Sequence, residues 1–193
     1  MFASTPLKPQ DVWMTRASTE SDLTYHIPPL DTDRIYFRIA ARTGGVIQHM
    51  VPMGHLVLLG SDTEWRVTPL NDDAVTPSSI SVRPQSFVGA NSATPQLLNN
   101  VCLYVAARGG HVRELGWQGN SSSYVTGDVS LRAAHLFDSL NVVELALSKA
   151  PVPILWAVSS NGKLLGCTYI GEEQVAAWHQ HDTDGTIESV CVA

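Results

Sequence analysis

The sequence predicts an all-β protein built from repeated antiparallel β-blades, a partial or complete β-propeller. One basis is residues 151–181, whose pattern predicts three consecutive antiparallel strands joined by two tight turns. A second is repetition, because Leu56, Leu103 and Leu155 open apolar segments that are each followed by a turn and another strand. Trp65, Val112 and Leu164 take equivalent places in those following strands. A period of about 50 residues with several short strands per unit is typical of propeller blades.

The predicted hairpin near the end of the chain gives the strongest local signal. Residues 154–158 are apolar, residues 159–162 (Ser-Ser-Asn-Gly) turn the chain, and residues 164–169 return. Asn-Gly between apolar runs favours a two-residue hairpin turn in which both central residues have positive φ. Residues 171–173 predict a second turn, and residues 175–179 a third strand.

Both faces of this predicted sheet are apolar. Ile154, Trp156 and Val158 share one face, and Leu155 and Ala157 share the other. A sheet that is apolar on both faces must be covered on both. The pattern therefore indicates a blade packed between two neighbours.

The rest of the chain follows the same plan. We expect strands at residues 11–14, 34–40, 46–51, 55–60, 64–67, 79–83, 86–90, 97–98, 101–106, 111–117 and 186–193, with a polar loop at 71–79 and a turn at Gly109-Gly110. These strands predict one propeller-like domain over residues 1–193, with blade-like units at about 1–40, 41–90, 91–135 and 136–193.

Residues 133–150 allow two interpretations. Leu136, Leu140, Val143 and Leu147 fall at helical spacing. Val143, Leu145 and Leu147 also alternate with more polar residues, which is the period of a strand. We favour a short turn near residues 133–139 and a strand over residues 141–147.

Composition excludes several classes of protein. Twelve Lys and Arg against eighteen Asp and Glu give a net charge of −6, and no basic cluster is present, so reading of a nucleic-acid duplex is disfavoured. The start has no pattern of a signal peptide, and no apolar run approaches the ~18 residues of a spanning helix, so we expect no membrane partner. Cys102, Cys167 and Cys191 lie in apolar, strand-like runs, and we expect buried, reduced thiols.

One polar segment could carry metal chemistry. His179, His181 and Asp182 follow a strand pattern in which alternate side chains share a face, so they could bind a transition metal or an adventitious ion. A hairpin with Asp184-Gly185 at its tip and the two histidines packed on its flank is the alternative, and we favour it. A metal-dependent hydrolase using these three residues is the least favoured of the functions considered.

Other candidates have simpler structural interpretations. The carboxylates Glu172, Glu173, Asp182 and Asp184 could form an acid–base pair, but a solvated loop is favoured. Four further polar residues lie around the predicted turn at Gly109-Gly110: Arg108, His111, Arg113 and Glu114. We interpret them as a solvated face or the rim of an interface. Tryptophans recur about once per unit; they are Trp13, Trp65, Trp117, Trp156 and Trp178. They could bind sugars, but packing within the blades is favoured. No catalytic, cofactor-binding or metal-binding residue is assigned, and we expect no enzyme.

Longer segments resemble a known family. Residues 154–169 (I-L-W-A-V-S-S-N-G-K-L-L-G-C-T-Y) and 172–192 (E-E-Q-V-A-A-W-H-Q-H-D-T-D-G-T-I-E-S-V-C-V) resemble the C-terminal half of the tail nozzle proteins, or tail tubular protein B, of short-tailed bacteriophages and prophages. The segments E-W-R-V, T-P-S-S-I-S-V-R-P-Q-S, A-R-G-G-H-V-R-E-L and Y-V-T-G-D-V-S-L-R-A-A-H-L-F-D resemble the same family in the same order. Family members are several times longer, so we expect a fragment of a longer tail protein.

The resemblance implies a structural role in the virion tail, assembled in the bacterial host cytoplasm. Nozzle subunits form a homohexameric ring below the portal and adaptor, with fibres nearby, and genomic DNA passes during ejection without sequence recognition. An acidic conduit would repel DNA phosphates and so avoid retaining the genome. The alternative function is a propeller-type binding module that recognises a host glycan or protein, with Trp117 or Trp178 as the sugar-contacting residue.

Overall fold

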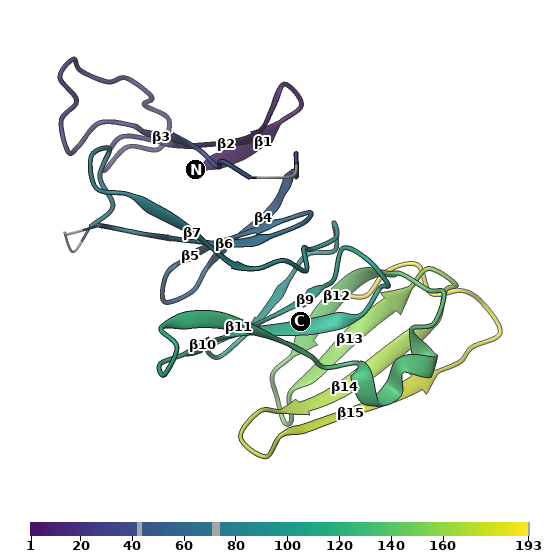
Figure 1. The fold of residues 1–193 in the computed structure, drawn as a ribbon. Coiled ribbons are helices and arrows are strands. Elements are labelled where there is room, and N and C mark those ends of the chain that lie inside the picture. Colours follow the sequence, from purple (N-terminus) through teal and green to yellow (C-terminus); the bar gives the residue numbers. More distant parts are fainter. Residues whose placement is uncertain (42–43, 71–73, 193) are drawn as a thin grey trace. The chain divides into compact units, whose positions relative to one another are not determined.

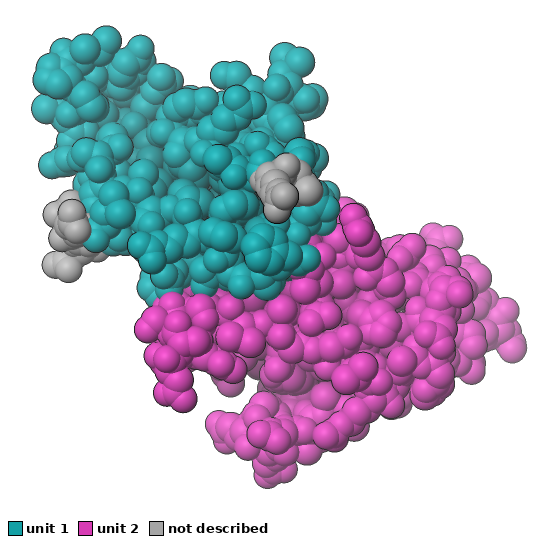
Figure 2. Space-filling view, in the orientation of Figure 1, with its two compact units in different colours: residues 1–87 teal, residues 88–193 magenta. Residues whose placement is uncertain are grey.

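The computed structural model describes residues 1–41, 44–70 and 74–192. Its described residues form four antiparallel sheets and one short 3-10 helix, so the predicted all-β class with repeated blades is confirmed (Figure 1). The chain divides into two compact units, residues 1–87 and 88–193 (Figure 2). Each sheet lies inside one of the four predicted blade-like units; that all four make a single domain stays a prediction.

The first unit contains two sheets. The first sheet has the order β1 (Phe2–Thr5), β2 (Lys8–Met14), β3 (Ile35–Arg38), and the second the order β4 (Ile47–Pro52), β5 (Leu56–Gly60), β6 (Glu64–Thr68), β7 (Ser81–Ser86). Their shared core consists of Val12, Ile39, Ile47, Leu58 and Val67. All five are buried, so one face of the first sheet is covered by the second.

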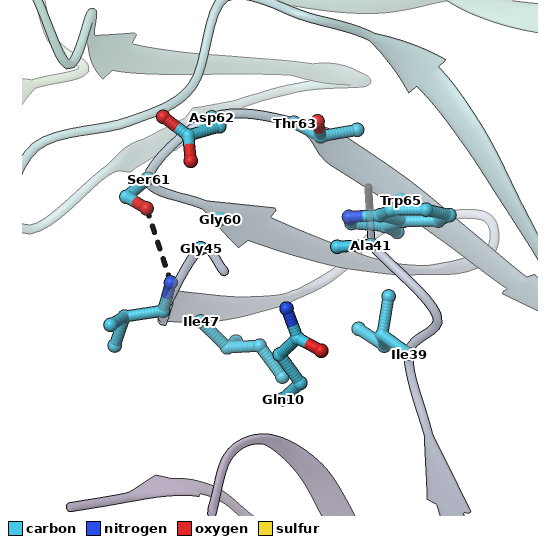
Figure 3. Close-up of a pocket in the computed structure, with 11 residues that line it drawn as sticks. Gln10, Ile39, Ala41, Gly45, Ile47, Gly60, Ser61, Asp62, Thr63 and Trp65 are labelled. Carbon is cyan, nitrogen blue, oxygen red and sulfur yellow. Dashed lines mark hydrogen bonds between the residues drawn. The ribbon is translucent and has the colours of Figure 1, made fainter. Parts of the chain in front are cut away.

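A small cavity lies at one end of this core (Figure 3). Ile39, Ile47 and Trp65 line it together with the turn at Ser61, whose hydroxyl accepts the Val46 N–H at 3.1 Å. Its volume of about 10 Å³ is close to the least that holds one water molecule. The cavity therefore has no room for an organic ligand.

The second unit also contains two sheets. The third sheet consists of β8 (Gln96–Leu98), β9 (Val101–Val105), β10 (Val112–Gln118) and β11 (Ser123–Asp128), and the fourth of β12 (Val142–Ser148), β13 (Ile154–Ser159), β14 (Leu164–Ile170) and β15 (Val175–His181). The 3-10 helix η1 (Leu131–Leu136) joins them.

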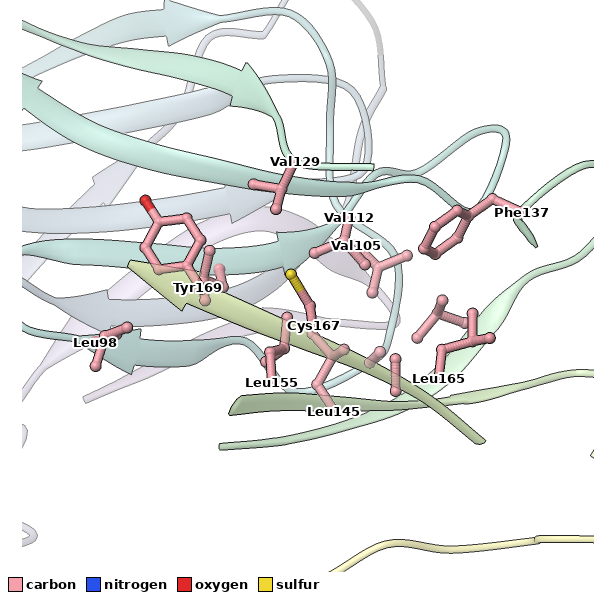
Figure 4. Packing of buried hydrophobic residues seen from close by; sticks show 14 residues of the cluster. Leu98, Val105, Val112, Val129, Phe137, Leu145, Leu155, Leu165, Cys167 and Tyr169 are labelled. Atoms are coloured by element: carbon pink, nitrogen blue, oxygen red, sulfur yellow. The ribbon is translucent and has the colours of Figure 1, made fainter. Parts of the chain in front are cut away.

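One apolar core fills the space between the third and fourth sheets (Figure 4). Leu103 and Val112 come from the third sheet, Leu155 and Leu165 from the fourth, and all four are at most 1% exposed. Phe137, just after η1, is also 1% exposed and closes one end. Burial of five such side chains at about 1.5–3 kcal/mol each makes this core the main attraction between the two sheets.

The predicted repeat is present in the structure. Leu56, Leu103 and Leu155 lie in β5, β9 and β13, the second strand of their sheets. Trp65, Val112 and Leu164 lie in β6, β10 and β14, the third strand. The strand predicted over residues 141–147 is also confirmed as β12, so residues 142–148 are not helical.

The Asn-Gly turn was predicted as the wrong type. Gly162 N–H bonds to the Ser159 carbonyl at 2.9 Å, and Ser159 N–H bonds to the Lys163 carbonyl at 3.0 Å. Gly162 has φ +79°, and Asn161 does not have positive φ. The loop therefore has three residues, with glycine in the left-handed position, because the Asn161 side chain accepts hydrogen bonds from Ser159 and from the Lys163 N–H.

Other predicted boundaries were also wrong. Pro84 does not separate two strands, since β7 runs through it at the edge of its sheet, where a missing N–H costs no ladder bond. Of the strand predicted over residues 86–90, Ser86 ends β7, and residues 87–90 form no strand beyond an isolated bridge at Ala90. Residues 186–192 are irregular rather than a strand, and Ala193 lies outside the described residues, as do 71–73 of the predicted polar loop. β11 was not predicted; within residues 1–30, where one or two strands were expected, only residues 11–14 of β2 were located and β1 was not.

The cysteines divide into two kinds. Cys102 and Cys167 are buried and free, as expected, and burial raises the pKa of each thiol to about 12. Cys191 contradicts the prediction, because it is exposed and lies in the irregular C-terminal segment. The apolar neighbours of Cys191 suggested a strand, but no sheet pairs with them.

Candidate functional site: the outer face of the fourth sheet

The fourth sheet buries one face in the core and turns the other away from it; we call the latter the outer face. Strand pairing places Trp156, Gly166 and His179 in one row across β13, β14 and β15. Val158, Leu164 and His181 form the next row on the same face. The face thus carries the apolar and aromatic side chains that the sequence predicted to need a cover.

Three rings contact one another on the outer face, and we call them the ring cluster: Trp156, His179 and His181. The Trp156 and His181 centroids are 5.4 Å apart, and the two imidazoles are 4.9 Å apart. Gly166 makes this possible, because a Cβ there would overlap the His179 ring. Burial, and then the charge of His181, lower the pKa of His179, which favours its neutral form.

The C-terminal segment covers one end of the outer face. Ile187 N–H donates to the Gly162 carbonyl at 2.8 Å, and Val190 N–H donates to a Glu144 carboxylate oxygen at 2.9 Å. This backbone hydrogen bond is the main reason that the pKa of Glu144 is lowered. Val158 is consequently 1% exposed, while Trp156 and His179 are half-buried and His181 is exposed.

The metal-binding hypothesis gains no third ligand from this geometry. Asp182 accepts the Gln180 amide at 2.9 and 3.0 Å and lies 3.4 Å from the Lys163 ammonium. Within residues 1–41, 44–70 and 74–192, no group of three His, Cys, Asp or Glu side chains is placed to hold a metal ion. The two histidines instead pack with Trp156 on the fourth sheet. The favoured hairpin with Asp184-Gly185 at its tip is not formed, because residues 186–192 are irregular and pair with no strand.

The other predicted acidic residues do not gather in a pocket. Glu172 and Glu173 are exposed in the turn between β14 and β15, and Asp184 is exposed in the C-terminal segment. Acid–base catalysis by two carboxyl groups needs environments that give them different pKa values. Exposed positions in solvated loops do not provide such environments.

Sequence reasoning missed a Ser–His–Asp cluster in the second unit. The Ser130 hydroxyl lies 2.9 Å from His111 Nδ1 and donates to Asp128 at 2.7 Å, and Asp128 also lies 3.3 Å from His111 Nδ1. A catalytic triad needs the serine and the aspartate on different imidazole nitrogens and an accessible serine. Here both contact the same nitrogen, and Ser130 is 0% exposed. The cluster therefore fixes the chain between β11 and η1.

Glu114 also has a structural role rather than the exposed one expected. It lies on the face of the third sheet that meets the fourth, and the Tyr169 hydroxyl donates to its carboxylate. Burial, and then this hydrogen bond, raise the pKa of Tyr169. Two openings of about 420 and 400 Å³ border Glu114, Tyr169 and Gly171. The hydrogen bond from Tyr169 to Glu114 therefore links the third and fourth sheets beside these openings.

The two tryptophans considered for sugar binding are poorly placed for it. Trp178 packs on Phe137 at 4.8 Å, and its indole N–H donates to the Val129 carbonyl at 3.0 Å. Trp117 is 40% exposed, but its ring meets Tyr124 at 5.1 Å with an interplanar angle of 69°. Trp178 belongs to the core, and Trp117 belongs to a cross-strand aromatic pair.

Comparison with known proteins adds no relative. No family model matches the chain, and no curated protein matches it. In the part of the chain that the structure describes, no helix has the length and apolar character to span a membrane.

Proposed function

We propose that the protein is a structural component of a short-tailed phage or prophage tail, belonging to the nozzle through which DNA is ejected. Two observations support this. The segments that resemble nozzle proteins lie on the repeated sheets, including all of β13 and β15 and all but the last residue of β14. The outer face of the fourth sheet, which carries the ring cluster, is the single structural feature on which the proposal depends.

The ring cluster favours assembly because it is only partly covered. Trp156 and His179 keep part of their surface in water although the same sheet buries Leu155 and Leu165 completely on its other face. A neighbouring subunit that covered the outer face would remove this apolar surface from water at about 25 cal/mol per Å². A face of one subunit that meets a different face of the next is the type of contact that closes into rings.

The net charge of −6 fits a DNA conduit. Like charge prevents the wall from binding the phosphates of a passing duplex, so the genome is not retained. The clusters at His111 and Glu114 support a structural role as well, because their polar groups are occupied by contacts within the protein.

Measurement of mass tests the proposal. We expect mass photometry and light scattering to show a concentration-dependent oligomer, with a hexamer at its upper limit. Trp156→Glu, which places a charge in the ring cluster, should give monomers. Leu131→Glu is the matched control, because Leu131 is 68% exposed on η1 and belongs to no core, so its oligomer should persist. A wild-type chain that stays monomeric at every accessible concentration overturns the proposal.

A further inference from the structure

The first sheet also has an outer face, the one directed away from the core that it shares with the second sheet. Phe2, Trp13 and Tyr36 lie opposite one another on β1, β2 and β3, and we call them the aromatic row. Phe2 is 45% exposed and Tyr36 is 47% exposed, while Val12 on the other face is fully buried. The Trp13 and Tyr36 rings are 5.8 Å apart and inclined by 32°, so they form one nearly continuous surface.

Basic side chains surround the aromatic row. The Lys8 ammonium lies 6.0 Å from the Trp13 ring centre and 5.9 Å from that of Tyr36. Arg38 follows Tyr36 by two residues on β3, so it shares the face, and its side chain is 65% exposed. Arg34 precedes Tyr36 by two residues, and its guanidinium lies 4.3 Å from the Tyr25 ring. Asp11 is the acidic group beside them, 3.9 Å from Lys8 and 3.2 Å from Arg38, so the three cations outnumber it and the patch is positive although the chain as a whole is acidic.

A buried carboxylate holds two of these groups in place. Asp11 is 1% exposed; it accepts the Tyr36 hydroxyl at 2.8 Å, and its other oxygen lies 3.2 Å from Arg38 Nε. That second oxygen is buried and accepts no geometrically sound hydrogen bond from the described residues. A buried charge is costly unless it is paired, so Asp11 fixes Tyr36 and Arg38 before any ligand arrives. Asp11 is a positioning residue, since its own surface is closed.

Sheet stability alone explains only part of this arrangement. A cross-strand aromatic pair modestly stabilises a sheet, which accounts for Trp13 beside Tyr36. Such a pair does not require exposed cations around the rings. It also does not require a buried acid such as Asp11, which orients the Tyr36 ring. An aromatic surface with fixed charged donors at its edge is suited to a sugar, because the C–H face of the ring packs on the aromatics and the hydroxyls and acid group bond to the donors.

We propose that the outer face of the first sheet binds a saccharide that carries a carboxylate. The sugar ring packs on Trp13 and Tyr36, and its carboxylate pairs with Lys8 and Arg38. The Lys8 ammonium lies 3.9 Å from an Asp11 carboxylate oxygen, and it exchanges this ion pair for the sugar carboxylate by moving its 57% exposed side chain. The site lies wholly in the first unit, so it goes beyond the nozzle proposal and does not depend on it.

Single-stranded nucleic acid is the competing ligand, since it also combines stacking rings with negative charge. Binding of that kind uses a basic groove that follows about 4–16 nucleotides of backbone. The aromatic row and its cations form a compact patch, and the net charge of −6 opposes a long polyanion. A short acidic sugar needs one carboxylate contact and one stacking surface, which this face supplies.

A titration with three probes tests the proposal. The 193-residue chain is titrated with three probes. They are a hyaluronan tetrasaccharide, in which glucuronate alternates with N-acetylglucosamine, the uncharged N-acetylglucosamine tetramer, and a short oligothymidine. Amide and indole NMR shifts report binding. We expect shifts at Trp13 with the acidic sugar and at least about fivefold weaker binding of the neutral one, as expected for loss of one or two exposed ion pairs. Equal binding of both sugars, tighter binding of oligothymidine, or no binding overturns the proposal.

Variants locate the site. Lys8→Glu reverses the charge of a side chain that is 57% exposed and lies 3.9 Å from Asp11, so circular dichroism first checks that the fold is retained. Affinity for the acidic sugar should then fall by about tenfold while the neutral sugar is unaffected. Tyr36→Ser removes the stacking ring and should abolish binding of both. Trp117→Ala is the matched control, because that ring is similarly exposed but lies in the second unit, and binding should be unchanged. Loss of binding in Trp117→Ala, or none in Lys8→Glu, places the site elsewhere.

Discussion

Leu155→Ala tests whether the core between the third and fourth sheets holds the second unit together. Leu155 is 0% exposed and belongs to the same core as Leu103 and Leu165. Removal of a fully buried leucine side chain leaves a cavity in a rigid sheet pair, and costs about 2–5 kcal/mol. We take about 3 kcal/mol, which corresponds to a fall of roughly 6–12 °C in Tm for a chain of this size.

Urea titration followed by tryptophan fluorescence and far-UV circular dichroism measures this change. Leu131→Ala is the matched control, since the same atoms are removed from a side chain that is 68% exposed. It should change the free energy of unfolding by less than about 0.5 kcal/mol. If Leu155→Ala costs no more than Leu131→Ala, the two sheets are not held by this core and the packing argument fails.

Three further predictions concern single groups. Gly166→Ala should cost about 1–3 kcal/mol because a Cβ overlaps the His179 ring, whereas Gly116→Ala should cost little, since its nearest neighbour is Val101 Cγ2 at 3.8 Å; thermal denaturation of both measures the difference. A thiol reagent should modify Cys191 alone in the native protein and all three cysteines in denaturant. The reason is that burial raises the pKa of the Cys102 and Cys167 thiols to about 12. Fast labelling of either of these thiols in the native protein would contradict their burial. Asp33 accepts N–H groups from His26 and Leu30, and these bonds lower its pKa from 3.8 to about 2 despite the opposing effect of burial. The depressed pKa means that its stabilisation is present above pH 3.8 and is lost as pH falls towards 2, so Asp33→Asn should flatten the acid limb of stability; an unchanged limb, or a carboxyl pKa near 3.8 by NMR, argues against it.

Much of the fold could be predicted because a strand with one face in the core shows apolar residues at every second position of its sequence. The alternation of Val143, Leu145 and Leu147 identified β12, and Asn161-Gly162 located the turn between β13 and β14. β11 was missed because Ser, Thr and Gly dominate it, and its stability comes from pairing with β10 rather than from its own apolar side chains. Residues 186–192 resembled a strand but bond through single N–H groups to Gly162 and Glu144, a contact that no local pattern reveals.

The sites were less predictable than the strands. His179 and His181 were recognised as neighbours on one face, but the third member of the ring cluster, Trp156, comes from another strand across Gly166. Asp11 reads as an ordinary surface aspartate, and only pairing of β2 with β3 brings it to Tyr36 and Arg38. Register between strands distant in sequence decides such groupings, and one chain read alone carries little information about it.

Pro84 has a consequence for how copies of this chain can join. It stands in β7, the edge strand of the second sheet, and offers no N–H to a strand arriving from another molecule. Growth by edge-to-edge addition, the route to fibres, is therefore blocked at that position. At that edge, a contact between molecules must therefore rely on side chains, whose fit and chemistry can discriminate one partner from another.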